Sequence, residues 1–225
     1  MGDNQLHLHG HEYMEKLLKA ESSGRLLRLM QFIEIKKSYR VADFACGNAP
    51  MLDLLDQKVE NYSGVDFSPS AINNAEARKN KLASGNSHFY CGSIQSFCNE
   101  NIGKFDVGFA FDLSEHVYDK EWVQMLLSIK SSLKKGGKLY IHTPNGKFFL
   151  EIMKSFNFIF KQFSEHIAVR NVEENIILLE RSGFKINKIA FLSHYNILKF
   201  IHVFSYIPWV GKYFQARLFI IAESL

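Results

Sequence analysis

The sequence predicts an α/β protein built on a doubly wound, mainly parallel sheet. Short apolar runs alternate with helical patterns between residues 40 and 192, which is typical of a parallel sheet covered by helices on both faces. Polar residues follow the predicted strands, at the edge where such sheets bind ligands. With 225 residues, 47% of them hydrophobic, and only 4 Pro, the chain suits one large core. We therefore expect residues 1–225 to form a single domain.

Composition disfavours several classes of function. The net charge of +4 comes from interspersed charges of both signs, and the sequence lacks the basic tract that is typical of nucleic-acid-binding proteins. The 3 Cys lack CxxC spacing, so neither a disulfide framework nor a zinc site is indicated, and we expect no metal. The polar N-terminus does not resemble a signal peptide. These features predict a cytoplasmic protein.

The N-terminal region, residues 1–35, is predicted to form a helical cap. Apolar residues recur there at three-to-four spacing, with a break near Ser22-Ser23-Gly24, and this indicates two amphipathic helices. His7, His9 and His11 alternate in a way that suits metal ligands on a strand, but a polar lead-in to the fold is the favoured interpretation.

The first predicted strand, Arg40–Phe44, leads into a run of mostly small side chains that we call the small-residue loop, residues 45–49. A helical pattern follows at residues 51–55. Small side chains let the backbone approach a ligand closely, and the first amides of a helix are free donors with partial positive charge. This stretch is therefore the predicted ligand-binding loop.

An acid follows the second predicted strand, Tyr62–Val65. Asp66 lies about twenty residues beyond Gly47, and in a doubly wound sheet an acid in that position accepts hydrogen bonds from a ribose diol. Ser68 and Pro69 suit the N-cap and the first position of the helix that comes next.

The rest of the sheet follows the same rhythm. Strands are predicted at His88–Cys91, Phe105–Asp112 and Lys138–His142, with a helix at Trp122–Leu133 that stops at Lys134-Lys135-Gly136-Gly137. A helix ending near residue 183 leads to the predicted strands Ile186–Leu192 and Arg217–Ala222, the last strands of the chain.

Two segments, residues 146–168 and 194–214, are unusually apolar for a protein surface. Four interpretations stay open for them: core packing, a lid over the ligand site, a dimer surface, or an interfacial helix at a membrane anchored by Trp209. Lys199, His202 and Lys212 interrupt the second segment, which argues against a spanning helix.

Taken together, the motifs resemble a class I S-adenosylmethionine (SAM)-dependent methyltransferase over roughly residues 35–190. Within that superfamily the chain is similar to small-molecule quinone O-methyltransferases and amino-sugar N-methyltransferases. The residues that carry the resemblance are Asp43-x-Ala45-Cys46-Gly47-x-Ala49, Asp66, Gly92-Ser93-Ile94, Phe105-Asp106, Ser114-Glu115-His116-Val117, Leu133-Lys-Lys-Gly-Gly-Lys-Leu, Glu165-His166-Ile167 and Leu179-Glu180-Arg181-Ser182-Gly183-Phe184.

The resemblance implies a Rossmann-like seven-stranded sheet of order 3-2-1-4-5-7-6 with strand 7 antiparallel. It implies SAM as cofactor, with S-adenosylhomocysteine as product. Gly47 would pass under the methionine part, Asp43 would order the loop and face the ammonium, and Asp66 would hold the ribose. Ser93 and Ile94 would border the adenine, and Asp112 would face the methyl donor. The full set of implied cofactor-binding residues is Asp43, Ala45, Cys46, Gly47, Asp66, Phe67, Ser93, Ile94, Asp112 and Leu113.

The chain departs from the family pattern at three positions. Ala45 and Ala49 replace glycines, so we expect both to keep a negative φ, because an alanine disfavours the left-handed region. Ser93 replaces an acid and can still hydrogen-bond an adenine amine, without charge assistance.

For catalysis, a hydroxyl acceptor needs a base, and a histidine suits that role. His116 is the first candidate and His166 the second, with His142 and His194 as competitors. Cys46 is expected to be a buried packing residue.

The predicted function is methyl transfer to an oxygen or nitrogen of a small, partly apolar acceptor. An NAD-dependent oxidoreductase and a catalytically silent SAM-binding or membrane-interface protein are the alternatives. Expected partners are the acceptor and, on one interpretation, a membrane surface touched peripherally, with no nucleic acid. The chain is expected to be a monomer or a homodimer.

Overall fold

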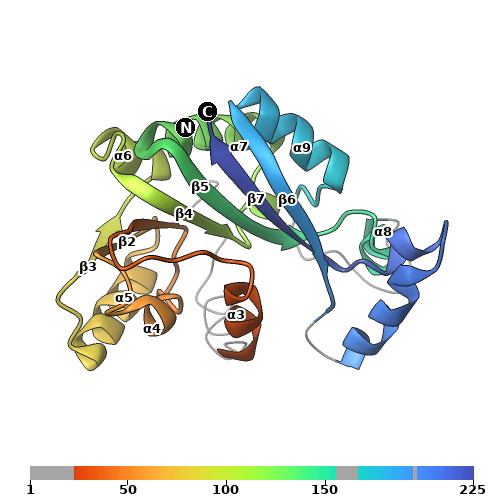
Figure 1. Ribbon diagram of the computed structural model, residues 1–225, viewed down its shortest axis with the longest axis horizontal. Helices are drawn as coiled ribbons and strands as arrows, with labels where there is room; N and C mark the ends of the chain where they lie inside the picture. Colours follow the sequence, from red (N-terminus) through yellow and green to blue (C-terminus); the bar gives the residue numbers. More distant parts are fainter. Residues whose placement is uncertain (1–22, 156–166, 195–196) are drawn as a thin grey trace. The chain divides into compact units, whose positions relative to one another are not determined.

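The protein contains a seven-stranded sheet of order β3-β2-β1-β4-β5-β7-β6 (Figure 1). The computed structural model describes residues 23–155, 167–194 and 197–225. The pairs β1–β2, β2–β3 and β4–β5 are parallel, whereas β7 is antiparallel to β5 and to β6. The predicted order and the antiparallel last strand are confirmed. The strands are β1 Arg40–Phe44, β2 Asn61–Asp66, β3 Ser87–Cys91, β4 Phe105–Phe111, β5 Leu133–Pro144, β6 Phe184–Leu192 and β7 Arg217–Ser224.

Helices connect these strands in the alternation that the sequence predicts. The α-helices are α3 Ser23–Met30, α4 Leu52–Leu55, α5 Pro69–Leu82, α6 Ile94–Asn99, α7 Asp119–Ser132, α8 Phe149–Ser155 and α9 Val172–Arg181. The part of the chain that the structure describes also holds three 3-10 helices: η1 Ser114–His116, η2 Ile197–Tyr206 and η3 Gly211–Phe214. Of the two predicted N-terminal helices, the second is α3, and the first lies outside the described residues together with His7, His9 and His11.

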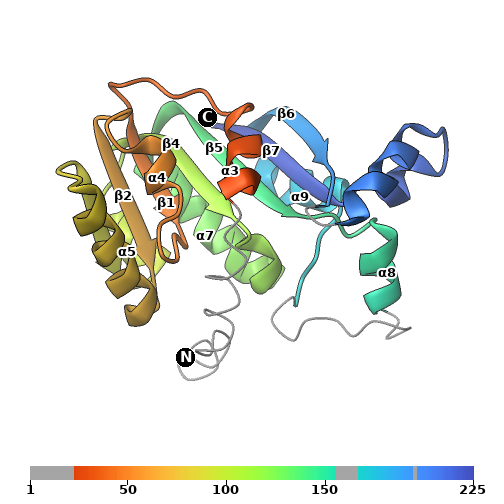
Figure 2. The same ribbon diagram turned by 90° about the horizontal axis from the view of Figure 1, so that it is seen from below.

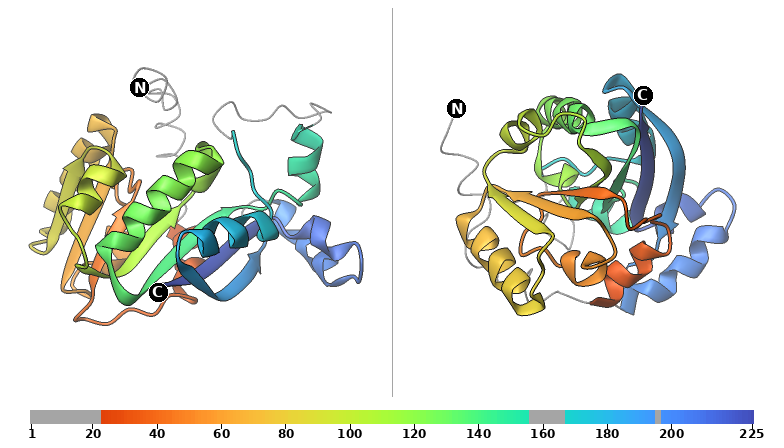
Figure 3. Two further views of the ribbon diagram at one scale, coloured as in Figure 1. Left: turned by 90° about the horizontal axis from the view of Figure 1, so that it is seen from above. Right: turned by 60° about the vertical axis from the view of Figure 1, so that its left-hand side comes forward.

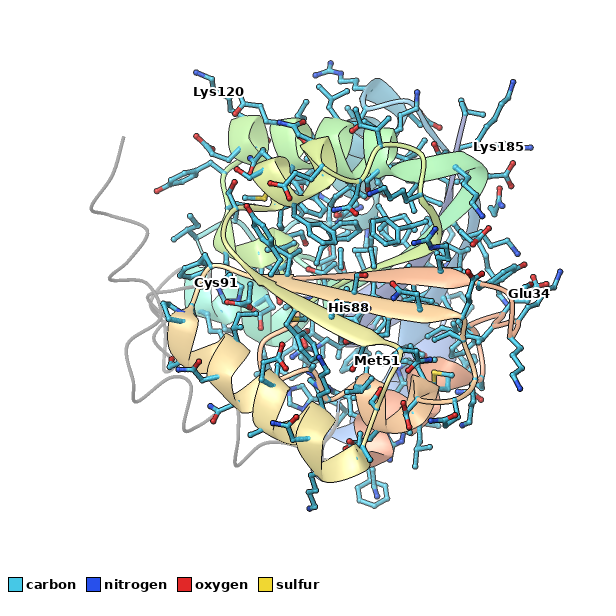
Figure 4. All side chains as sticks on the ribbon, turned by 90° about the vertical axis from the view of Figure 1, so that its left-hand side faces the viewer. Glu34, Met51, His88, Cys91, Lys120 and Lys185 are labelled. Atoms are coloured by element: carbon cyan, nitrogen blue, oxygen red, sulfur yellow. The ribbon has the colours of Figure 1, made fainter. Side chains whose placement is uncertain are left out.

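The chain divides into two compact units after Ser93. In the first unit α5 packs on β2 and β3. The side chain of Ser68 caps α5 by accepting from the Ala71 N–H at 3.3 Å, and Pro69 takes the first helical position, as predicted. Figure 4 looks onto the β3 edge, with His88 and Cys91 labelled along that strand. The first unit therefore presents the carboxyl ends of β1, β2 and β3 side by side.

The second unit, from Ile94 onward, holds β4, β5, β7 and β6. Helices α6, α7 and α9 lie together along this part of the sheet (Figure 3, left), and α7 contacts β5 while α9 contacts β6. The buried rings of Phe109, Tyr140 and Phe219 stack from strand to strand, with centroids 5.8 and 6.0 Å apart. This aromatic row crosses β4, β5 and β7 and forms the centre of the unit's core.

The start of β5 differs from the prediction. Helix α7 ends at Ser132, close to the predicted stop, but the strand begins at Leu133, where we expected Lys138. Leu133 pairs with Phe105 before a shift in register, and Gly136 within the irregular stretch has φ +76°. The Lys-Lys-Gly-Gly run is thus an irregular first part of the strand, because glycine permits the left-handed geometry there.

The two apolar segments belong to the second unit. Helix α8 lies in the first segment, residues 146–168, of which residues 156–166 are outside the described part of the chain. The described part of the second segment, residues 194–214, forms η2 and η3 in place of one continuous interfacial helix. Figures 1 and 2 show this blue segment beyond the ends of β6 and β7, with α8 beside it.

Candidate active site

The small-residue loop of the first unit has an unusual backbone. Ala45, Gly47 and Ala49 have φ values of +60°, +56° and +53°, so the expectation of negative φ at both alanines is wrong. Hydrogen bonds explain the geometry, since the Cys46 N–H donates to the Val65 carbonyl at 3.0 Å and the Ala49 N–H donates to the Cys46 carbonyl at 2.8 Å. The loop keeps the turn that glycine would make, at a cost of about 1–2 kcal/mol for each alanine.

Asp66 ties this loop to the end of β2. One carboxylate oxygen accepts from the Gly47 N–H at 2.9 Å, and the other accepts from the Ser68 N–H at 2.9 Å. Burial raises the pKa of Asp66, and the backbone hydrogen bonds oppose that shift. The backbone N–H of Phe67 also bonds to this carboxylate, whose two oxygens offer about four acceptor sites. Asp66 can therefore order the loop and still accept a hydrogen bond from a ligand hydroxyl.

Asp43 contacts the neighbouring strand β2. It is buried at the end of β1 and accepts a hydrogen bond from the Tyr62 hydroxyl on β2. Burial raises the pKa of Asp43 to about 7, the bond from Tyr62 lowers it, and the charge of Asp66 raises it further. The hydrogen bond from the Gly47 N–H is accepted by Asp66, and the contact of Asp43 with a cofactor stays a prediction.

Open space lies beside Gly47. A Cβ atom placed on Gly47 would meet no atom within 4 Å. Phe67, next to Asp66, is partly exposed. Three features here fit a nucleoside-type cofactor such as SAM. They are the glycine backbone with open space beside it, an acid that can accept hydrogen bonds from hydroxyl groups, and the neighbouring aromatic ring.

Cys46 and Gly64 fill the other side of the loop. Cys46 is buried, as predicted, and burial raises the pKa of its thiol well above the ordinary range. A Cβ on Gly64 would lie 2.8 Å from the Cys46 sulfur and 2.8 Å from the Phe89 ring. The thiol is thus a packing group that requires glycine opposite it.

Arg78 of α5 makes a contact that the sequence did not predict. Its Nε donates to the Asn48 carbonyl at 2.9 Å, and its Nη1 forms an ion pair with Asp53. The guanidinium therefore joins α5 to the small-residue loop. Its position in a polar helix pattern gave no signal of this role.

Ser93 and Ile94, the predicted adenine neighbours, lie on either side of the division between the units. Ser93 is exposed after β3, and Ile94 is buried at the start of α6. Their contact with a cofactor stays a prediction.

A charged cluster occupies the carboxyl end of β4 in the second unit. Asp112 has φ +49°, and its Oδ1 lies 2.8 Å from Arg217 Nη1 and 3.1 Å from His142 Nδ1. His142 is fully buried on β5, and Arg217 begins β7. Leu113, which follows Asp112, is buried. The strand ends thus hold one acid between two basic side chains.

Glu115 is the second acid of this cluster, and it is 1% exposed. The Thr143 hydroxyl donates to its carboxylate at 3.1 Å, and the Ser114 hydroxyl lies 2.9 Å from Thr143. Burial raises the pKa of Glu115, the charge of Asp112 raises it further, and Arg217 lowers it. Glu115 and His116 are therefore buried residues of η1 and do not form a solvated helix start.

Arg170 fastens the segment around η1. Its guanidinium donates to the carbonyls of Ser114, Val117 and Ala168 and forms an ion pair with Asp119 at 2.8 Å. One buried cation thereby connects the chain after β4 to the chain before α9. The sequence carried no signal of this contact either.

The candidate bases lie in different settings. His116 is buried on η1, directly after Glu115. His142 contacts Asp112, and the His194 ring stacks against Phe148 with centroids 6.4 Å apart. His166 falls outside the described residues. Of the two catalytic candidates, only His116 can therefore be placed.

The described ranges hold neither a metal-binding cluster nor a helix that could span a membrane. Residues 23–155, 167–194 and 197–225 contain no group of three or more His, Cys, Asp or Glu side chains arranged to hold a metal ion. None of the helices in these ranges has the length and apolarity needed to cross a membrane.

The sheet order and the acid-anchored loop after β1 define a class I SAM-dependent methyltransferase domain. The model of the family described as a methyltransferase domain matches residues 35–190, so the chain belongs to that family. Membership implies SAM as cofactor.

Individual relatives agree with this assignment. A ubiquinone biosynthesis O-methyltransferase of Coxiella burnetii is 30% identical over 126 residues, covering 55% of this chain and 51% of the relative. The chain thus matches about half the length of that curated relative. The YcgJ protein of Bacillus subtilis shares the fold, with TM-score 0.67 and 12% identity over 90% of this chain and 99% of that one. Magnesium protoporphyrin IX methyltransferase of Synechocystis, solved with bound S-adenosylhomocysteine, has TM-score 0.65 and 17% identity over 90% and 81%.

Proposed function

We propose that this protein transfers the methyl group of SAM to an oxygen of a small, partly apolar acceptor, with transfer to nitrogen as the alternative. The observation that carries the proposal is Asp66, which holds the Gly47 and Ser68 amides at 2.9 Å beside open space at Gly47. The relative from Coxiella burnetii is named for O-methylation in ubiquinone biosynthesis, which supports a hydroxyl acceptor.

The first unit would bind the cofactor. The Asp66 carboxylate would accept from the ribose hydroxyls, and the free side of Gly47 would admit the backbone close to the ligand. The buried Asp43 would face the cofactor's ammonium, whose charge would favour the ionised carboxylate. SAM supplies an activated methyl group on a sulfonium. The other proposed cofactor residues of this unit are Ala45, Cys46, Phe67 and Ser93. Ile94, Asp112 and Leu113 belong to the second unit, and their contact with the cofactor is proposed from the family resemblance alone.

The second unit would handle the acceptor. His116 would take the proton of the acceptor hydroxyl, and His166 is the second candidate for that step. The buried Glu115, with its raised pKa, would hold the η1 segment through Thr143 and keep His116 in position. Rate enhancement would come mainly from orientation in a site that excludes water.

Calorimetry with S-adenosylhomocysteine and with NAD tests the cofactor. We expect the first ligand to bind and NAD not to bind. Binding of NAD alone would support the oxidoreductase, and binding of neither would support a catalytically silent membrane-interface protein.

A matched pair of variants locates the site. Gly47→Ala and Gly103→Ala both place a methyl group at a positive φ, +56° and +61°, with no atom within 4 Å. Both should lose about 1–2 kcal/mol of stability. Only Gly47→Ala should weaken binding of S-adenosylhomocysteine, because its methyl group would occupy the cofactor's space. Equal affinity in the two variants would place the cofactor elsewhere.

Release of S-adenosylhomocysteine in the presence of candidate acceptors tests the reaction. Phenols with an alkyl substituent should be methylated faster than the same phenols without it, and matched anilines distinguish oxygen from nitrogen. If the protein binds the cofactor but methylates neither the phenols nor the anilines, its function would be cofactor binding without catalysis.

A further inference from the structure

The segment that joins β6 to β7 exposes an apolar surface in the second unit. We define the η2–η3 surface as its exposed apolar side chains, and these are Phe200, Val203, Phe204, Tyr206, Ile207, Trp209, Val210 and Tyr213. Trp209 is 93% exposed, Tyr206 is 81% and Phe200 is 68%. Apolar side chains gathered at this density on a surface mark an interaction site.

This surface rests on an ordered scaffold. The Gly211 N–H donates to the Ile207 carbonyl at 2.8 Å, which folds η3 back on η2. Gly211 is buried, and a Cβ there would lie 2.2 Å from the Ser205 carbonyl oxygen. Phe214 packs on Phe204 at 5.3 Å and on Phe149 of α8 at 5.7 Å between centroids. Gly211 and Phe214 thus hold the segment together, and Phe204 contacts Phe214 while staying 44% exposed.

The charges of the segment have one sign. Residues 197–214 contain no Asp or Glu, whereas they contain Lys199 and Lys212. Each ammonium lies over the neighbouring aromatic ring, with Lys199 5.1 Å from the Phe200 centroid and Lys212 5.1 Å from the Tyr213 centroid. Cations next to exposed aromatic rings complement a partner that has an apolar interior and negatively charged groups on its surface.

We infer that the η2–η3 surface binds the interface of an anionic lipid bilayer. Tryptophan and tyrosine favour the level of the lipid headgroups, lysines extend their charged ends toward lipid phosphates, and the aliphatic and Phe side chains enter the acyl boundary. One apolar patch together with a few cations gives reversible attachment. A second copy of the chain would have to bring acids to face Lys199 and Lys212, and this segment has none to offer in a symmetric pair.

The position of the surface gives the attachment a consequence. Because β6 is followed by η2, and η3 is followed by β7, the surface lies at the sheet edge where Arg217 and Asp112 meet. Attachment would place that edge against the bilayer. If the proposed function holds, acceptors dissolved in the membrane would reach it without crossing bulk water.

Tryptophan fluorescence provides a direct test, because the chain has only 2 Trp and the other, Trp122, is buried. We expect vesicles of phosphatidylcholine with phosphatidylglycerol to shift the emission to the blue and to carry the protein upward in a flotation gradient. Pure phosphatidylcholine vesicles should do so weakly. The variant Trp209→Phe should still float and lose the blue shift.

Two further variants separate the apolar contribution to vesicle binding from the electrostatic contribution. Trp209→Ser should lower the partition coefficient by about tenfold, and the double variant Lys199→Glu/Lys212→Glu should remove the preference for anionic vesicles. Ile102→Ser, which changes another exposed apolar residue of the same unit, is the matched control and should float like the wild type. These assays need neither cofactor nor acceptor, so their outcome is independent of the methyltransferase assays.

Three results would overturn the inference. One is the absence of flotation with both vesicle types, and another is flotation that Trp209→Ser and Ile102→Ser reduce equally. The third is a wild-type dimer in light scattering that does not float and that Trp209→Ser converts to a monomer, which would assign the surface to a second copy.

Discussion

Arg217 and Asp112 form an ion pair of 2.8 Å between residues 105 positions apart in the chain. The pair joins the first residue of β7 to the residue after β4. It also places a permanent cation beside two acids, because Arg217 opposes the rise in the pKa of Glu115 that burial and Asp112 cause. The pair therefore sets the electrostatics of the strand ends in the second unit.

Removing this cation should destabilise the protein. We expect Arg217→Ala to lower the free energy of unfolding by about 2 kcal/mol, since the partly buried Asp112 would lose a charged partner. Urea denaturation of the two single variants and of the double variant with Asp112→Ala would measure their coupling energy.

Lys147→Ala provides the control for that experiment, because its ion pair with Glu173 is exposed. Its cost should stay below about 1 kcal/mol. If the coupling energy between Arg217 and Asp112 is no larger than that of the exposed pair, the buried ion pair contributes no more to stability than the exposed one.

Glycine at the two strained alanines should stabilise the fold. Ala45→Gly and Ala49→Gly relieve about 1–2 kcal/mol of left-handed strain and lose about 0.4–1 kcal/mol to the greater freedom of the unfolded chain. Each should therefore raise the free energy of unfolding by about 0.5–1 kcal/mol in denaturant titrations.

The matched change inside a helix should have the opposite sign. Ala75→Gly in α5 should cost about 1 kcal/mol, because α5 gains nothing from glycine. If all three substitutions destabilise by similar amounts, the positive φ values do not carry strain.

Asp43 should make stability depend on pH. Its folded-state pKa, about 7, lies above the value of about 3.9 in an unfolded chain, so the folded state binds the proton more tightly. The contribution of Asp43 is fully present below about pH 3.9 and is lost as the pH rises to about 7, by up to about 4 kcal/mol. Unfolding free energies of the wild type and of Asp43→Asn, compared across this range, would measure it.

The asparagine variant should show a shallower decline with pH. Glu115, whose pKa is also raised, stays in both proteins, so the difference between the two curves isolates Asp43. Parallel curves would mean that the carboxyl group has the same proton affinity in the folded and unfolded chains.

His116 should matter for turnover and little for cofactor affinity. Under the proposed function, His116→Ala should lower kcat with a hydroxyl acceptor by about 10²–10⁴-fold. Binding of S-adenosylhomocysteine, measured by calorimetry, should stay unchanged.

His88→Ala is the matched control, because His88 is exposed on β3. It should leave both quantities unaltered. A wild-type rate in His116→Ala would transfer the role to His166 or leave a mechanism based on orientation alone.

Much of the fold could be predicted because local sequence patterns determine where many of its strands and helices begin and end. The run Arg40–Phe44 is β1 as predicted, and Ser68-Pro69 starts α5, because strand apolarity and helix capping act over a few residues. The irregular start of β5 was missed because Lys-Lys-Gly-Gly has the composition of a turn, and only its pairing with β4 makes it part of a strand.

The site was harder to predict, because its geometry depends on distant partners. The sign of φ at Ala45 and Ala49 follows from hydrogen bonds to Val65 and Cys46, and residue type alone suggested the opposite sign. The contact of Arg217 with Asp112 joins strands that only the tertiary fold brings together.

Arg170 fixes two separate stretches of the second unit at one point. Because its guanidinium binds the carbonyls of Ser114, Val117 and Ala168, the loss of this one side chain would release the chain at η1 and the chain before α9 together. Under the proposed function, the position of His116 in η1 therefore depends on a side chain that itself takes no part in the reaction.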